Sequence, residues 1–195
     1  MKDYTEGSEE LKIGRAKRMM LWSGIVSLGM SFAGLTSAYV VSKSRPDWIE
    51  NLVLPSAFVY SLILIVLSSI TFHFAKKKIQ VGDHSVGMGL LIATLVLGLG
   101  FVYFQFAGFD EIIGIFGYNP TGPTANITYT FIFLIAVVHI AHIAAALICL
   151  LVVIYNHYKQ RYVNGKTLGI ELAATFWHFV DFLWIYLFLF FYFVR

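Results

Sequence analysis

Five ionisable residues lie inside otherwise apolar stretches in the C-terminal part of the chain. They are His139, His142, Glu171, His178 and Asp181. Imidazole and carboxylate groups can bind zinc or iron, can relay protons, or can hydrogen-bond one helix to another. An acid at the middle of a bilayer costs about 2.5–3.5 kcal/mol on insertion scales, so such groups should face protein and find partners there. The residue types alone leave all three uses open.

The spacing of these residues favours the third use, a hydrogen-bonded clasp between two helices. His139 and His142 are three residues apart and therefore lie on one helical face. Glu171, His178 and Asp181 fall within about 80° of one another around a helix. In an antiparallel helix pair, Glu171 is level with His142, and His178 with His139. We therefore expect Glu171 to pair with a histidine such as His142, with a metal site and a proton relay as the alternatives that the residues leave open.

The overall composition is that of an integral membrane protein. Of the 195 residues, 58% are hydrophobic and 13% are charged, whereas a soluble domain has about 45–50% apolar and about 25% charged residues. This chain has too little polar surface to coat a globule in water. The composition therefore excludes a soluble enzyme, a disordered chain and a nucleic-acid-binding module.

Five stretches are long and apolar enough to cross a bilayer core, which needs roughly 20 helical residues. The turn residues between Gly117 and Pro123 separate the third stretch from the fourth, because proline and glycine there cannot continue a helix. The sequence predicts an all-α bundle of five transmembrane helices in one domain, residues 19–195, after a cytoplasmic tail, residues 1–18. The helices are expected at residues 19–42, 51–76, 84–109, 125–158 and 167–194.

The basic residues are distributed unequally between the two sides of this predicted bundle. Eleven of the 14 lie in the N-terminal tail and in the loops after the second and fourth helices, and the other three are Lys43, Arg45 and Arg195. Because basic loops stay on the cytoplasmic side, we expect the N-terminus inside and the C-terminus outside. Within the first helix, Ser23, Ser27 and Ser31 recur every four residues, which favours a helix-packing face.

Several motifs resemble the cytochrome c oxidase subunit III family. Residues Glu171–Trp184 are similar to the family's last helix, which has a Glu, a few small residues, then Trp-His-Phe-Val-Asp and a Trp three residues on. His139-Ile-Ala-His142 resembles the HxxH of the preceding helix. Leu97-Gly98-Leu99 with Phe101 and Gln105, and Phe32-Ala33-Gly34, resemble motifs of two earlier helices. The order and spacing hold from about Arg18 to the C-terminus.

The sequence also departs from this family. The common form has seven helices, and this chain begins where the third would begin. The two missing helices form one arm of the family's lipid-holding cleft. Leu28 stands where the family's third helix usually carries a membrane-embedded Glu, and Gly108 stands where an acidic residue follows the Gln.

The resemblance implies a non-catalytic subunit III of a haem–copper cytochrome c oxidase, which reduces O₂ to water and pumps protons. Haem and copper would then belong to partner subunits I and II, and no residue of this chain would be catalytic or bind a cofactor or metal. Phospholipid is the one ligand that the resemblance suggests for this chain. Other partners would be membrane lipid and other respiratory-chain complexes, and no nucleic acid is expected. The location would be the bacterial cytoplasmic membrane. The alternative is a free-standing five-helix transporter or metalloenzyme that uses His139, His142, Glu171, His178 and Asp181.

Overall fold

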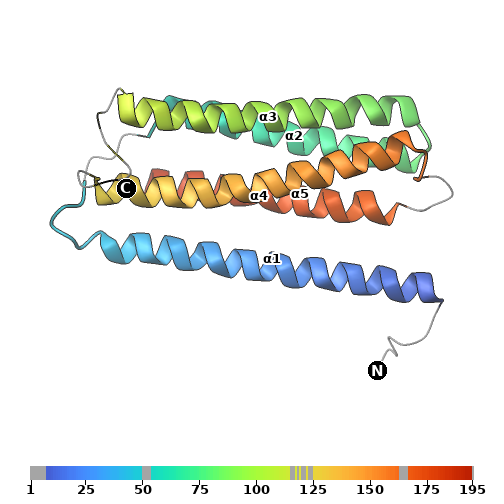
Figure 1. Ribbon diagram of the computed structural model, residues 1–195, viewed down its shortest axis with the longest axis horizontal. Helices are drawn as coiled ribbons and strands as arrows, with labels where there is room; N and C mark the ends of the chain where they lie inside the picture. The colour runs from blue at the N-terminus through green and yellow to red at the C-terminus, as the bar shows by residue number, and fades with distance from the viewer. Residues whose placement is uncertain are drawn as a thin grey trace.

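The computed structural model describes residues 8–49, 54–114, 117, 119, 122, 125–162 and 167–194. Over these residues the chain forms five long helices and no strand (Figure 1). The helices are α1 (Glu9–Ser42), α2 (Ser56–Gln80), α3 (His84–Gly114), α4 (Ile127–Tyr158) and α5 (Leu168–Phe193). All five are long and apolar enough to span a membrane, which confirms the predicted all-α five-helix class.

Three helices extend further into the charged segments than the sequence pattern predicts. Helix α1 begins at Glu9 rather than at residue 19, so most of the predicted tail is helical. Glu9 and Glu10 lie in its first turn, where their negative charges interact favourably with the helix dipole. Helices α2 and α3 continue four and five residues past their predicted ends, to Gln80 and Gly114. Charged residues mark the edge of the apolar span, but they do not end a helix.

Backbone hydrogen bonds close the turn between α2 and α3. The N–H of Gly82 donates to the carbonyl of Ile79, and the N–H of Asp83 donates to the carbonyl of Lys78. This Schellman arrangement requires the left-handed conformation, which Gly82 adopts at φ 89°. The Asp83 side chain then accepts the N–H of Val86 in the first turn of α3. The predicted turn between α3 and α4 falls outside the described residues, except for Gly117, Asn119 and Gly122.

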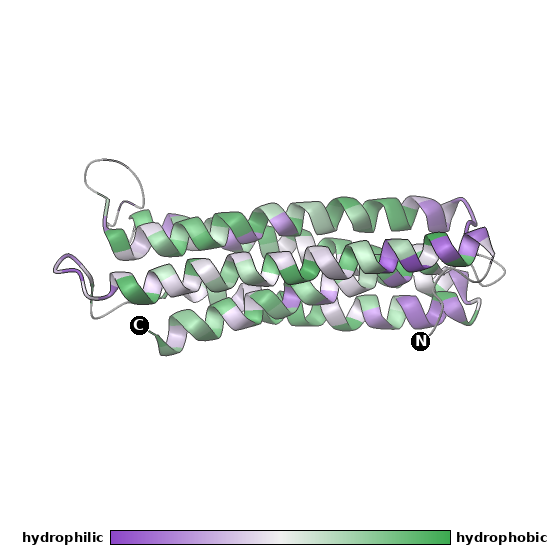
Figure 2. Cartoon of the chain, turned by 90° about the horizontal axis from the view of Figure 1, so that it is seen from below, coloured by the Kyte–Doolittle hydropathy of each residue, from purple (hydrophilic) through white to green (hydrophobic). Residues whose placement is uncertain are grey.

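Helices α2 to α5 pack as a bundle, and α1 lies at its edge. Helix α1 packs against α4 and α5 but not against α2 or α3 (Figure 1). Hydrophobic residues cover the middle of the helices, and hydrophilic residues gather at the end that holds the N-terminus (Figure 2). The α2–α3 turn, the end of α4 and the start of α5 lie at this same end. The alternating direction of the helices therefore places most of the basic residues together.

Two glycines allow close packing inside the bundle. A Cβ on Gly98 would come within 2.9 Å of the Trp177 ring and 3.1 Å of Leu147. A Cβ on Gly108 would collide with the Phe58 ring. The position where the family resemblance leads us to expect an acidic residue therefore has no room for a side chain in this protein, because Phe58 fills it.

The small residues of α1 face away from the bundle. Its buried side consists of Ile25, Phe32, Thr36 and Tyr39. Ser23, Ser27 and Ser31 are exposed on the opposite side. The predicted packing face therefore does not pack against any described helix of this chain.

Candidate functional site

The structure does not bring the five predicted site residues together. None of their side chains hydrogen-bonds another of the five. Over the described ranges, no group of three or more His, Cys, Asp and Glu residues is close enough to hold a metal ion. The five residues are distributed over separate local environments, which we describe in turn.

Glu171 contacts α1 and α2 instead of α4. Its Oε2 accepts a hydrogen bond from the Arg18 guanidinium at 2.9 Å, which forms an ion pair. Its Oε1 accepts from Thr167 at 2.9 Å and from the Gln80 amide at 3.4 Å. The predicted pairing of Glu171 with His142 is therefore wrong. The prediction considered only α4 as a neighbour, whereas the helical extension of α1 brings Arg18 beside the first turn of α5.

The two α4 histidines also lie in different environments. The His139 ring is fully buried and stacks on Trp184 with 5.1 Å between ring centroids. Neither of its nitrogens has a hydrogen-bond partner within the described part of the chain. His142 is half-buried, and its Nδ1 donates to the carbonyl of Val138 on its own helix at 2.7 Å. Neither imidazole reaches a carboxylate, so the predicted clasp between α4 and α5 is not formed by these residues.

The remaining two residues face α2. The Nδ1 of His178 hydrogen-bonds the hydroxyl of Ser69 at 2.6 Å. Asp181 is 2% exposed. Its carboxyl group lies near the Ser69 hydroxyl, but neither oxygen has a partner at hydrogen-bond distance in the described ranges. These two residues therefore belong to the packing between α5 and α2.

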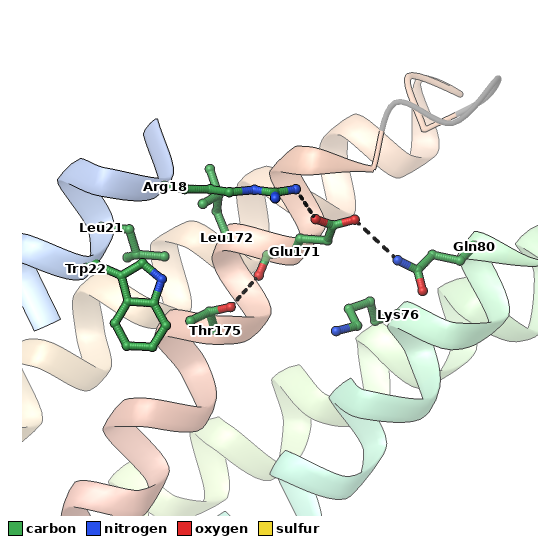
Figure 3. Close-up of a pocket in the computed structure, with 8 residues that line it drawn as sticks. All are labelled: Arg18, Leu21, Trp22, Lys76, Gln80, Glu171, Leu172 and Thr175. Carbon is green, nitrogen blue, oxygen red and sulfur yellow. Dashed lines mark hydrogen bonds and ion pairs between the residues drawn. The ribbon is translucent and has the colours of Figure 1, made fainter. Parts of the chain in front are cut away.

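Next to Glu171 the surface is hollowed into a pocket of about 370 Å³ between α1, α2 and α5 (Figure 3). Its lining combines the Arg18–Glu171 ion pair with a second cation, an amide, a hydroxyl and three apolar side chains. The remaining lining residues are Leu21, Trp22, Lys76, Gln80, Leu172 and Thr175. Sequence reasoning missed this pocket. The sequence feature that indicates it is the presence of basic residues at the same end of the first two helices, which the prediction takes only as evidence of orientation.

A pair of double-mutant cycles distinguishes the observed Glu171 partner from the predicted one. The Arg18 and Glu171 side chains are 59% and 31% exposed, and such ion pairs couple by about 0.2–1 kcal/mol. Unfolding in mild detergent should show coupling of this size between Arg18→Ala and Glu171→Ala. The cycle that combines Glu171→Ala with His142→Ala should show none, because the two side chains do not touch. Stronger coupling to His142 than to Arg18 would contradict the observed arrangement.

Comparison with known proteins identifies relatives over nearly the whole chain. The family model described as cytochrome c oxidase subunit III matches residues 20–195. Cytochrome bo(3) ubiquinol oxidase subunit 3 of Buchnera aphidicola subsp. Acyrthosiphon pisum is 28% identical, over 93% of this chain and 88% of the relative. Its counterpart in Pseudomonas putida is 27% identical, over 90% and 84%. Cytochrome c oxidase subunit 3 of Corynebacterium diphtheriae is 27% identical, over 85% and 82%.

Proposed function

The chain belongs to the cytochrome c oxidase subunit III family, and from this premise we propose that it binds subunits I and II of a haem–copper terminal oxidase and supports their sustained turnover. It is an accessory subunit of an oxidoreductase complex and carries no catalytic residue. The match to the family over residues 20–195 is the single observation that carries this proposal.

The arrangement of the polar residues supports an indirect contribution to turnover. Glu171 lies near one end of α5 and is neutralised by Arg18. Leu28 occupies the position of the family's embedded acid. About 10 Å of helix separates Glu171 from His178, the next ionisable residue along α5 before Asp181. This distance exceeds the reach of a hydrogen bond, so Glu171 does not form a continuous proton path with His178 and Asp181. The chain therefore acts by packing against the catalytic subunit and by holding phospholipid at the junction.

The partners and membrane follow from the same proposal. Haem and copper reside in subunits I and II, where O₂ is reduced, and the complex associates with other respiratory-chain complexes. Relatives from bacteria support a bacterial cytoplasmic membrane as the location. The alternative, a free-standing transporter or metalloenzyme, requires the histidines and carboxylates to converge. The separate surroundings of His139, Glu171 and His178 do not favour it.

Purification from the native membrane in mild detergent tests the proposal. The tagged chain should elute with partner subunits whose haem absorption bands rise in proportion to the amount of the chain. Stronger detergent should release the chain in a form without those bands. Elution of the chain by itself from mild detergent, with no haem-absorbing partner at any ionic strength, would contradict the proposal.

The proposed orientation places the N-terminus inside and the C-terminus outside, as the distribution of basic residues favours. Lys77 in the last turn of α2 and Ser44 just after α1 are exposed, and these two helix ends lie at opposite ends of the bundle (Figure 1). Single cysteines at these two positions, in a Cys149→Ser background, should react with an impermeant thiol reagent from opposite sides of the membrane. Ser44→Cys should label from outside and Lys77→Cys only after the inner face is opened. Labelling of both from one side would contradict the five-span topology.

A further inference from the structure

The pocket between α1, α2 and α5 lies where α1 and α2 both border α5 without packing against each other. Helix α1 packs against α5 but not against α2, so the space between α1 and α2 is open above α5. Arg18 and Trp22 line it from α1, Lys76 and Gln80 from α2, and Glu171 from the base on α5 (Figure 3). The pocket lies near the start of α5 and the end of α2, at the end of the bundle where hydrophilic residues gather (Figure 2).

The charges of this pocket leave one cation without a counter-ion. Arg18 and Glu171 neutralise each other at 2.9 Å. Lys76 is half-buried, and no carboxylate in the described ranges lies within ion-pair distance of its ammonium group. An ammonium partly withdrawn from water is stabilised by an anion that replaces the lost hydration. The pocket therefore has a net charge of one positive unit and fits a ligand with one negative charge.

The apolar part of the lining extends from the charged end towards the middle of the membrane. Leu21, Trp22 and Leu172 lie beside the charged groups, and Trp22 is 59% exposed. Tryptophan prefers the depth of lipid headgroups, where its ring is in an apolar environment and its N–H is hydrated. A ligand that satisfies both parts of the lining has an anionic head and an apolar tail.

A second groove, which Leu21 and Leu172 also line, lacks this combination. It has a volume of about 290 Å³, lies between α1, α4 and α5, and contains no charged side chain. Its lining includes Ile148, Val152 and Phe176. This groove therefore offers no charge with which to distinguish one headgroup from another, whereas the pocket at Lys76 does.

We propose that the pocket formed by Arg18, Trp22, Lys76 and Glu171 binds a phospholipid whose headgroup carries a single negative charge, with the phosphodiester at the Lys76 ammonium group. Side chains of α1, α2 and α5 alone build this site. This lipid-binding proposal rests on the proposed function in one respect, because it names a place where the chain holds lipid. Its test below uses no oxidase activity and no partner subunit.

Fluorescence of Trp22 in nanodiscs provides the measurement. The full chain is placed in phosphatidylcholine that contains a minority of phosphatidylglycerol, and one of the two lipids carries a quencher on its acyl chain near the headgroup. The difference between the wild type and Trp22→Phe isolates the Trp22 signal from the other three tryptophans. Labelled phosphatidylglycerol should quench Trp22 more strongly than the same fraction of labelled phosphatidylcholine.

Charge variants on adjacent residues of α2 separate a site from a general surface attraction. One basic residue near a membrane contributes about 1 kcal/mol to anionic-lipid binding, so Lys76→Gln should reduce the preference for phosphatidylglycerol about fivefold. Lys77→Gln removes the same charge one residue away, where the side chain is exposed and outside the pocket, and should reduce the preference much less, because it acts only through the surface potential. Lys76→Arg should retain it.

Three results would overturn the proposal. The first is equal quenching by the two lipids in the wild type. The second is an equal loss of preference in Lys76→Gln and Lys77→Gln, which would indicate surface potential alone. The third is displacement of the lipid by inorganic phosphate, which would assign the pocket to a free anion. Failure of the chain to purify with haem-containing partners would leave the quenching result unchanged, so the two proposals fail separately.

Discussion

Oxidase from which this chain has been removed should keep its haem absorption bands and its first turnovers, and should then lose activity several-fold faster than the intact complex. The expectation follows from the proposed division of labour, in which no reacting atom contacts this chain. Removal exposes the face of the catalytic subunit that the chain covered and releases the lipid held at the junction. Oxygen consumption followed in reconstituted membranes, together with the haem spectrum before and after turnover, measures both parts.

Two outcomes of this experiment would contradict the supportive role. Loss of haem bands on removal would mean that the chain helps to hold a cofactor, and equal durability would mean that it protects nothing. A matched control is the intact oxidase taken through the same detergent steps under conditions that retain the chain. Its rate of activity loss corrects for damage by the detergent.

Replacement of Trp184 by alanine should destabilise the bundle more than substitution of any residue on its surface. Trp184 is fully buried. Its ring stacks on His139 of α4 and makes edge contacts with Phe58 of α2 at 5.7 Å and Phe101 of α3 at 5.4 Å. Truncation therefore leaves a void where four helices meet. Such changes cost about 3–5 kcal/mol in soluble cores, and we expect about 3 kcal/mol here, because lipid is as apolar as the core.

Thermal or denaturant unfolding in mild detergent measures this effect, with Trp22→Ala as the matched control. Trp22 is 59% exposed on α1, so its removal should change the unfolding free energy by no more than about 0.5 kcal/mol. The Trp184 indole N–H has no hydrogen-bond partner among the described residues. Trp184→Phe should therefore recover most of the lost stability through its ring alone. Similar losses for Trp184→Ala and Trp22→Ala would contradict the central position assigned to Trp184.

The number and order of the helices could be predicted from the sequence because a bilayer imposes a simple rule. A helix must present roughly 20 apolar residues to lipid, and this rule identified all five spans. It did not predict where helices end, because hydrogen bonding continues past the membrane edge. Helix α1 therefore begins at Glu9 and α2 continues through Lys78 to Gln80.

The partners of the polar residues could not be predicted, because they depend on which helices are neighbours. Matching depths along α4 and α5 correctly placed Glu171 near the end of the bundle that carries the basic residues. The same reasoning could not show that α1 lies beside α5 and provides Arg18 as the partner. It also could not show that His178 faces Ser69 of α2. Depth is a one-dimensional quantity, and the choice among several helices at the same depth requires the packed structure.

Restoration of durability by adding the chain back is the most direct test of the proposed function. Depleted oxidase is reconstituted with purified wild-type chain, and oxygen consumption is followed until activity has decayed. The proposed function predicts that the added chain returns the decay rate to that of the intact complex, without altering the initial rate or the haem spectrum. An unchanged decay rate, with the chain demonstrably bound to the complex, would contradict it.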